Sequence, residues 1–312
     1  MAVVPLGYHE APPAGLRGGV VAVGNFDGVH RGHAALVTAA RNAAGRLGGP
    51  VVAVTFDPHP LVLLAPKRYQ PPLTTIAERA RLLHTIGADH VGVLRTTAEL
   101  LSLSPESFFE AIVRDAFGAR GMVEGFNFRF GKDRAGSNET LRTLCATSAI
   151  DFREVPPFEL GGRPVSSSRV RDALLAGDVA AATELLNRPY RITGVVGTGA
   201  KRGRTIGFPT ANLERVETLL PAEGVYAVSA VTPSGVYPGA ANIGPNPTFG
   251  EQDRKVEVHL LDFAADLYGQ PLSVDFVARL RDTKKFTGVD ALVEQLQTDA
   301  AEARRRVQQP RN

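Results

Sequence analysis

The sequence predicts two domains of different fold classes, an α/β domain built on a parallel sheet and a smaller antiparallel β-barrel with a C-terminal helix. In the first half, short runs rich in β-branched residues alternate with longer helical patterns, which is typical of a parallel sheet with helices on its faces. After Leu186 the pattern changes to short strands separated by glycine and proline, which favours a barrel. A length of 312 residues also suits two domains, and we place them at residues 1–186 and 187–312.

The first domain contains several segments that we expect to form parallel strands. They are residues 20–23, 51–56, 90–94, 121–124 and 152–155. Two helix starts between them are marked by local signals, a capping-box pattern at residues 75–78 and Ser104 followed by a proline. Two more helices are expected after Ser167 and after Asp178, with Gly177 ending the first of them.

The second domain contains short strands followed by one helix. The expected strands are residues 191–196, 224–231, 236–242, 255–261 and 273–280, and the helix spans residues 290–306. Their spacing, with turn residues between them, suits a small antiparallel barrel. The basic run 304–306 is expected to form the solvated end of the helix, where positive charge interacts favourably with the helix dipole.

Composition excludes several classes of protein. The 35 basic and 32 acidic residues give a net charge of +3, a balance too mild to indicate a nucleic-acid partner. The apolar runs are far shorter than the roughly 20 residues that span a bilayer, and the N-terminus lacks the pattern of a signal peptide. The single cysteine, Cys145, cannot form an internal disulfide. We therefore expect a cytoplasmic protein with no membrane partner.

A glycine-rich segment at residues 24–33 connects the first expected strand to a helix. Gly24, Gly28 and Gly32 let the backbone approach a ligand, and the start of the helix offers free N–H groups to phosphate. The spacing fits neither G-x-G-x-x-G nor a P-loop, so a plain dehydrogenase or P-loop kinase is disfavoured. The segment therefore predicts a phosphate site of another kind.

His30 and His33 lie at the mouth of the first strand, where doubly wound sheets bind their ligands. Their imidazole N–H groups could stabilise charge on a phosphate under attack. Two alternatives stay open at this point. The histidines could cap the helix or lie on the surface, or they could bind zinc with His59 as a third ligand.

A second motif lies far downstream, at residues 165–171. It offers three hydroxyl groups and two guanidinium groups to a polyphosphate at the start of a helix, whereas capping alone would need one serine. Together with the histidine motif it resembles the nucleotidyltransferase superfamily, which carries both motifs. This resemblance implies a Rossmann-like fold for the first domain.

Residues 197–212 combine a basic glycine-rich loop with the sequence Pro-Thr-Ala-Asn. Lys201 or Arg204 could hold phosphates, and the oxygens of Thr210 and Asn212 are hard ligands that suit Mg²⁺. A flexible hairpin would explain the glycines but would not explain threonine and asparagine together. The segment therefore predicts a second phosphate site.

These motifs, in this order, are similar to those of the bacterial bifunctional riboflavin kinase/FMN adenylyltransferases, or FAD synthetases. The matching stretches are residues 24–33, 55–60, 127–131, 203–213, 242–249 and 257–263. Departures are few. Ser168 replaces the usual threonine, Arg163 matches a common arginine only loosely, and Asn246 replaces the usual arginine, which weakens any claim for a charged contact there.

The resemblance implies two reactions with ATP as co-substrate and Mg²⁺ as cofactor. The second domain would convert riboflavin to FMN, with Glu257 accepting the hydroxyl proton, and the first would convert FMN to FAD, with His30 and His33 stabilising charge. The kinase site would include Gly199, Lys201, Gly203, Arg204, Gly207, Thr210 and Asn212, the last two binding the metal. The adenylyltransferase site would include Gly24, Phe26, Asp27, Gly32, Asn127, Ser167, Ser168 and Arg171 for ATP, and Phe56 and Pro58 for the flavin.

Two rival functions can be distinguished on the same residues. An adenylyltransferase for another acceptor would not need the kinase-like segment 199–212 or Glu257. A flavin-binding regulator or storage protein without turnover would be expected to have lost His30, His33 or Glu257, and all three are present.

Overall fold

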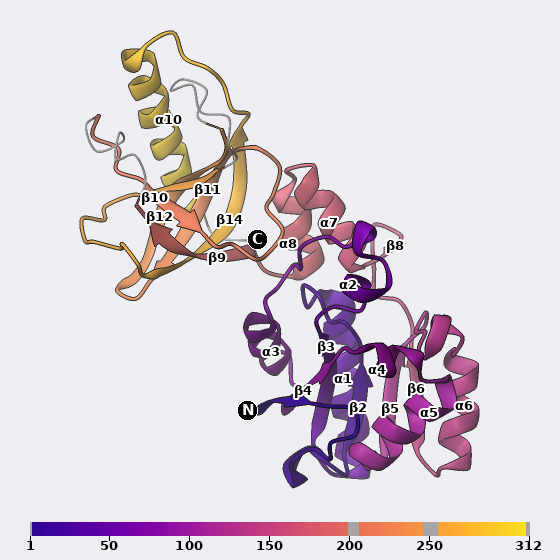
Figure 1. Cartoon of the computed structure of the whole chain (residues 1–312). Helices are drawn as coiled ribbons and strands as arrows, with labels where there is room; N and C mark the ends of the chain where they lie inside the picture. Colours follow the sequence, from indigo (N-terminus) through magenta and orange to yellow (C-terminus); the bar gives the residue numbers. More distant parts are fainter. Residues whose placement is uncertain (1, 199–205, 246–254, 310–312) are drawn as a thin grey trace. The chain divides into compact units, whose positions relative to one another are not determined.

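The computed structural model describes residues 2–198, 206–245 and 255–309 (Figure 1). The chain forms two compact units. One contains Met1–Gln70 and Thr74–Ser166, and the other contains Pro71–Leu73 and Ser167–Asn312. An α/β unit followed by a β-barrel with a C-terminal helix confirms the predicted fold class. The predicted boundary at 186/187 stays a prediction.

The first unit is built on a six-stranded parallel sheet in the order β1-β4-β3-β2-β5-β6. The strands are β1 (Ala2–Leu6), β2 (Val20–Val23), β3 (Val51–Asp57), β4 (His90–Arg95), β5 (Gly121–Gly125) and β6 (Asp151–Val155). The five predicted strands are all present. The edge strand β1 was not predicted.

Hydrophobic cores lie on both faces of this sheet. Val21 and Val52 pack in one cluster with Ile112, whereas Val20 and Val51 pack in the other with α1. Strands buried on both faces need continuous apolar runs, which is the pattern the sequence shows.

The first unit also contains the helices α1 (Arg31–Leu47), α2 (Leu61–Leu64), α3 (Ile76–Thr85), α4 (Ala98–Ser102), α5 (Pro105–Phe108) and α6 (Asn138–Thr147). Shorter helical elements are η1 (Ala14–Leu16), η2 (Pro66–Arg68), η4 (Lys132–Arg134) and the π-helical η3 (Phe109–Ala116). The strands β7 (Glu159–Leu160) and β8 (Arg163–Pro164) form a small hairpin.

The two predicted helix starts are confirmed. The side chain of Thr75 accepts a hydrogen bond from the Glu78 N–H and caps α3. Ser104 accepts one from the Ser107 N–H ahead of α5, with proline in the first turn. Local capping chemistry therefore sets where both helices begin.

The strand order reverses beside β2, because β3 lies on one side of it and β5 on the other. The ladder between β2 and β5 pairs Val20 with Gly121 and Val21 with Met122 and then ends. Beyond it, Oε1 of Glu124 accepts a 2.7 Å hydrogen bond from the Val23 N–H. Glu124 is only 1% exposed, and burial raises the pKa of its carboxyl group well above the usual range. The Glu124 carboxyl group therefore replaces a backbone partner at the carboxyl end of β2, and its burial favours the neutral form.

The second unit contains a closed antiparallel barrel in the order β10-β13-β12-β11-β14-β9. The strands are β9 (Tyr190–Gly197), β10 (Ala211–Glu214), β11 (Gly224–Thr232), β12 (Gly235–Gly244), β13 (Lys255–Leu260) and β14 (Pro271–Arg281). Tyr226, Val258 and Phe276 are completely buried. Helix α10 (Val289–Gln308) packs against β11, β12 and β14.

Two further helices, α7 (Ser167–Leu175) and α8 (Val179–Leu186), belong to the same compact unit as the barrel. They pack against each other, and α8 contacts β9 and β14. Gly177 joins them at φ 76°, and a Cβ atom there would lie 2.6 Å from Nη1 of Arg279 on β14. The Arg279 guanidinium also donates to the Ala176 carbonyl. Glycine is therefore required where the helical pair meets the barrel.

Replacing Glu124 by glutamine tests the buried carboxyl group. Because the pKa is raised in the folded protein, the wild-type side chain stabilises the fold fully below its unfolded pKa of about 4.3, and this contribution is lost as the pH rises toward the folded pKa. Glu124→Gln cannot ionise and keeps an oxygen for Val23. We expect its free energy of unfolding, relative to wild type, to rise with pH in urea titrations from pH 4 to pH 9. Parallel pH profiles would contradict this.

Candidate functional site

The loop after β2 brings both motif histidines to the start of α1. Nδ1 of His30 accepts from the His33 N–H and Nδ1 of His33 accepts from the His30 N–H, both at 3.3 Å, and the two rings stack 3.6 Å apart. The capping alternative is therefore observed. It does not compete with a chemical role, because a neutral imidazole that accepts through Nδ1 carries its proton on Nε2. The caps select the tautomer that presents two Nε2–H donors.

The zinc alternative finds no support in the described part of the chain. No group of three or more His, Cys, Asp or Glu side chains there could hold a metal ion. His59 uses its Nδ1 to accept from the Leu61 N–H at 3.1 Å. The three histidines therefore do not form a metal site.

The loop from Gly24 to His30 has an unusual backbone. Phe26 and Val29 have φ angles of 47° and 42°, in the left-handed region that L-residues avoid. Each such residue costs on the order of 1–3 kcal/mol, and a β-branched valine is the less tolerant of the two. Gly32 is favoured for a different reason, since a Cβ atom there would make a tight contact of 3.1 Å with the His30 ring. The surrounding structure must hold this loop in place.

Phe26 and Asp27 have buried side chains. Phe26 packs its ring edge-on against His33 at 5.2 Å, and the Asp27 carboxylate accepts a hydrogen bond from the Thr74 N–H at 3.2 Å. Both residues were predicted to bind ATP. Their side chains shape the loop, which leaves the backbone as the part of each residue that can face a ligand.

Other predicted residues follow the neighbouring strands at the same edge of the sheet. Phe56 is near the end of β3 with Pro58 just beyond it, and Asn127 is exposed two residues after β5. Because β3, β2 and β5 are adjacent and parallel, their carboxyl ends meet where such sheets bind ligands. The sheet thus places Gly24, the end of β3 at Phe56 and the loop that carries Asn127 at one edge.

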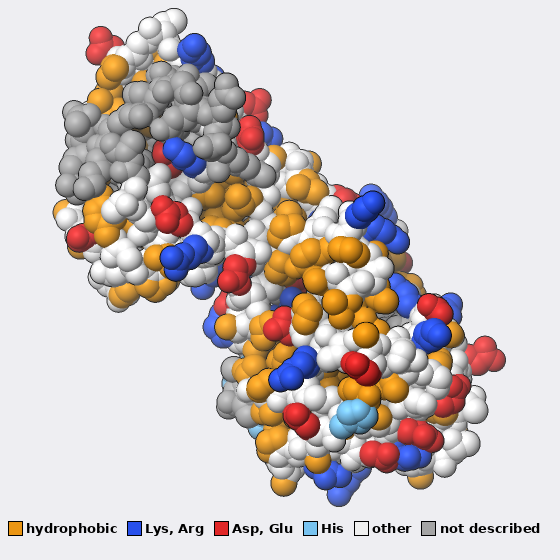
Figure 2. Space-filling view, in the orientation of Figure 1, with side chains coloured by type: hydrophobic (Ala, Val, Ile, Leu, Met, Phe, Trp, Pro, Cys, Tyr) orange, Lys and Arg blue, Asp and Glu red, His pale blue; other side chains and the backbone are white. Residues whose placement is uncertain are grey.

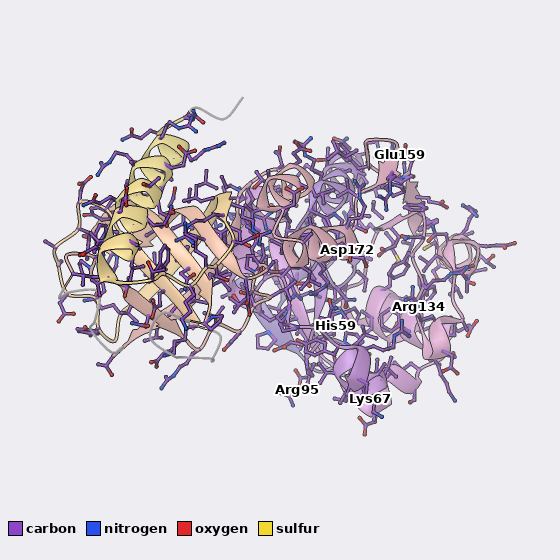
Figure 3. The ribbon with its side chains drawn as sticks, turned by 90° about the horizontal axis from the view of Figure 1, so that it is seen from above. His59, Lys67, Arg95, Arg134, Glu159 and Asp172 are labelled. Atoms are coloured by element: carbon purple, nitrogen blue, oxygen red, sulfur yellow. The ribbon has the colours of Figure 1, made fainter. Side chains whose placement is uncertain are left out.

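Basic side chains also belong to elements at this edge. Figure 3 labels Lys67 in η2, Arg95 at the end of β4 and Arg134 in η4, together with His59 after β3. Cationic groups at the carboxyl edge suit a phosphate-bearing ligand. Elsewhere, basic and acidic side chains of the described residues are interspersed on the face drawn in Figure 2.

The serine motif lies at the start of α7, in the second compact unit. Ser168 is exposed, and Ser167 is half-buried. Nη1 of Arg171 donates a 2.6 Å hydrogen bond to the Pro71 carbonyl. The two motifs of the first predicted phosphate site therefore belong to different compact units.

On the barrel, three polar residues occupy directly paired positions on adjacent strands. Asn212 on β10 pairs with Glu257 on β13, which pairs with Asn242 on β12. Glu257 is half-buried between Val256 and Val258, whose side chains fill the barrel core. Paired residues have Cβ atoms roughly 4.5–5.5 Å apart and side chains on one face. The barrel therefore brings the predicted base and one predicted metal ligand together.

Asn242 was not among the predicted site residues. Its only sequence signal is the Asn-Ile-Gly stretch shared with the family, and its position opposite Glu257 follows from the strand register alone.

Thr210 lies two positions before Asn212 and is exposed. Nδ1 of His259 donates a 2.8 Å hydrogen bond to the Pro209 carbonyl, and its ring packs 5.2 Å from Phe208. His259 therefore ties the segment before β10 to the strand that carries Glu257. The paired Asn212 and Glu257 offer amide and carboxylate oxygens, and Thr210 carries a hydroxyl two positions earlier in the chain. These are donors that Mg²⁺ prefers, so the donor set fits that ion.

Several predicted kinase residues cannot be placed. Gly199, Lys201, Gly203 and Arg204 lie outside the described residues, as does Asn246. Gly207 is described, with φ 85° in the left-handed region that favours glycine.

Two family models match consecutive stretches of the chain. Residues 13–169 match the FAD synthetase model, and residues 186–307 match the riboflavin kinase model. A crystal structure described as a macrolide-efflux protein from Streptococcus pneumoniae has a TM-score of 0.88 and 35% identity, covering 97% of this chain and 99% of that one. Within the described residues, no helix is both long and apolar enough to span a bilayer.

Curated relatives match nearly the whole chain. A bifunctional riboflavin kinase/FMN adenylyltransferase from Pseudomonas fluorescens is 39% identical over 299 residues, or 96% of each chain. The proteins of the same name from Escherichia coli K12 and Bacillus subtilis are each 36% identical, covering 96% and 91% of this chain. The chain therefore belongs to the family of bifunctional riboflavin kinase/FMN adenylyltransferases, with its FAD synthetase part first and its riboflavin kinase part second.

Proposed function

We propose that the two activities of the family are carried out at separate sites, riboflavin phosphorylation on the barrel and adenylyl transfer to FMN at the parallel sheet. One observation carries this proposal. The two family models match stretches that do not overlap, and each stretch contains its own group of chemically suited residues. The substrates are small molecules: riboflavin, FMN and ATP.

In the kinase reaction, Glu257 accepts the proton of the riboflavin 5′-hydroxyl as that oxygen attacks the γ-phosphate of ATP. An alcohol is a poor nucleophile, so a positioned base matters here. Thr210 and Asn212 would hold Mg²⁺, which neutralises charge on the ATP phosphates when bound. Gly199, Lys201, Gly203, Arg204 and Gly207 would bind those phosphates through backbone amides and positive charge.

In the adenylyl transfer, the FMN phosphate attacks the α-phosphate of ATP and pyrophosphate leaves. The nucleophile is already anionic, so the step needs alignment and charge stabilisation instead of a base. The Nε2–H groups of His30 and His33 donate to the developing charge. Gly24, Gly32, Asn127 and the backbone of Phe26 and Asp27 would border the ATP phosphates, and Ser167, Ser168 and Arg171 would hold them. Phe56 and Pro58 would line the flavin side.

We also propose the boundary 186/187 for the catalytic division and the cytoplasm as the compartment. The start of the riboflavin kinase match at residue 186 supports the boundary. The thiol of Cys145 is buried, and burial raises its pKa to about 12, which suits an inert thiol in a reducing compartment.

Substitution of Glu257 tests the proton acceptor. Glu257→Gln should lower riboflavin phosphorylation about 10²–10⁴-fold, because only the alcohol nucleophile needs a base. Conversion of supplied FMN to FAD should continue at the wild-type rate, with products separated by chromatography. Glu294→Gln, on the exposed face of α10, serves as the matched control and should change neither rate. Equal loss of both activities in folded Glu257→Gln would rule out Glu257 as the proton acceptor of the kinase reaction.

Substitution of both histidines tests charge stabilisation in adenylyl transfer. The variant His30→Ala/His33→Ala should accumulate FMN but also lose the cap of α1, worth about 0.5–2 kcal/mol. The variant His30→Asn/His33→Gln keeps capping-box chemistry without imidazole. We expect both to lose FAD formation while only the first loses thermal stability. Normal FAD formation by the second variant would show that the imidazoles serve only as caps. His9→Gln is the control.

Two fragments test the boundary. Residues 187–312 and 167–312 should both convert riboflavin to FMN and make no FAD. The longer fragment should melt at a higher temperature, because α8 buries Leu185 and Leu186 and packs on β9 and β14. A well-folded 187–312 fragment without kinase activity would move the boundary toward the N-terminus.

A further inference from the structure

Arg79 is a buried arginine on α3 that no sequence motif singled out. Arg79 is only 3% exposed, whereas arginine is almost never fully buried without a partner. Burial lowers the pKa of its guanidinium, and the nearby carboxylates of Asp27 and Asp57 oppose that shift. A charge held out of water in this way must be compensated by specific bonds.

The guanidinium donates to three different residues. Nη2 donates to Oδ1 of Asp27 and to the Thr74 carbonyl, both at 3.2 Å. Nη1 donates to Oγ1 of Thr55 at 3.1 Å, and Nε donates to Oγ1 of Thr74 at 3.4 Å. All three nitrogens of the fork are therefore used inside the protein.

Each of these partners is bonded to, or belongs to, the loop that follows β2. The Thr55 hydroxyl donates to the Asn25 carbonyl at 3.0 Å, and the Thr74 hydroxyl accepts from the Gly28 N–H at 3.2 Å. Asp27 itself lies between these two residues. One guanidinium thus holds the loop at three positions within four residues, just before His30.

The backbone of this loop needs support, because Phe26 and Val29 both lie in the left-handed region. Strained residues keep such conformations only when the surrounding structure over-determines them. Val29 directly precedes His30, so a shift of the loop would move the two imidazole rings.

We propose that Arg79 is a positioning residue for adenylyl transfer, which holds residues 25–28 so that His30 and His33 keep their geometry. The inference rests on the proposed role of the two histidines.

The variant Arg79→Lys tests this in the full-length protein. Lysine keeps the charge for Asp27, but a single nitrogen cannot replace a fork that reaches Asp27, Thr55 and Thr74 together. We expect kcat for FMN adenylylation to fall about 10²-fold, as for a misplaced catalytic group, with KM for ATP changed less than about threefold. Riboflavin phosphorylation in the same preparation should be unchanged.

Hydrogen exchange supplies a readout independent of activity. Amides of residues 25–30 should exchange faster in Arg79→Lys, whereas those of the barrel should not. Arg81→Lys is the matched control, because Arg81 lies on the same helix, is exposed and pairs with Glu78 at 2.7 Å. Thr55→Val is a second variant that keeps the Arg79–Asp27 pair and breaks the bond to Asn25, and it should show the same changes to a smaller extent.

The outcomes separate this inference from the role of the histidines. Wild-type kcat and unchanged exchange at residues 25–30 in folded Arg79→Lys would overturn it. Equal losses of both activities and of exchange protection throughout the first unit, in Arg79→Lys and Thr55→Val alike, would also overturn it and indicate a general structural role. If the histidine variants still form FAD, faster exchange confined to residues 25–30 would still support positioning of the loop by Arg79.

Discussion

The parallel alignment of β3, β2 and β5 is the constraint on which the first unit depends. Adjacent parallel strands end at one edge, so loops from three distant parts of the sequence meet there. Two ionisable side chains are buried near this edge, at a cost in folding free energy. Glu124 is buried as a raised-pKa acid beside Val23, and Arg79 is buried against Asp27. Buried ionisable groups are costly unless they are neutral or paired. Burial favours the neutral form of Glu124, and Arg79 is paired with Asp27.

In the barrel, one alternating pattern produces both the core and the proposed kinase site. Val256 and Val258 face inward, so Glu257 between them must face outward. The antiparallel register then places Asn212 and Asn242 on either side of it. A slip of one residue on β13 would exchange the carboxylate with a core valine. Correct strand pairing, which the closed barrel enforces, is therefore also what assembles the chemistry.

The sequence was informative wherever the signal is local. Strand composition, the caps at Thr75 and Ser104 and the glycine at Gly177 were all predictable, because each depends on a few neighbouring residues. Arg79, Glu124 and Asn242 were not. From the sequence, an arginine in an amphipathic helix is expected to lie on the solvent-facing side. No local signal shows that α3 directs Arg79 toward Asp27. Likewise β1 has only five residues, includes proline and is recognisable only through its pairing with β4.

The helices α7 and α8 show where sequence families and physical packing divide the chain differently. The FAD synthetase match ends at residue 169, within α7, yet both helices belong to the compact unit of the barrel. The packing explains this: the Ala222 N–H donates to the Leu174 carbonyl, and Arg279 donates to the carbonyl that precedes Gly177. The helix that begins at the serine motif is therefore stabilised by barrel residues. The serine motif, which the family resemblance assigns to adenylyl transfer, thus depends for its local structure on the part of the chain that matches riboflavin kinase.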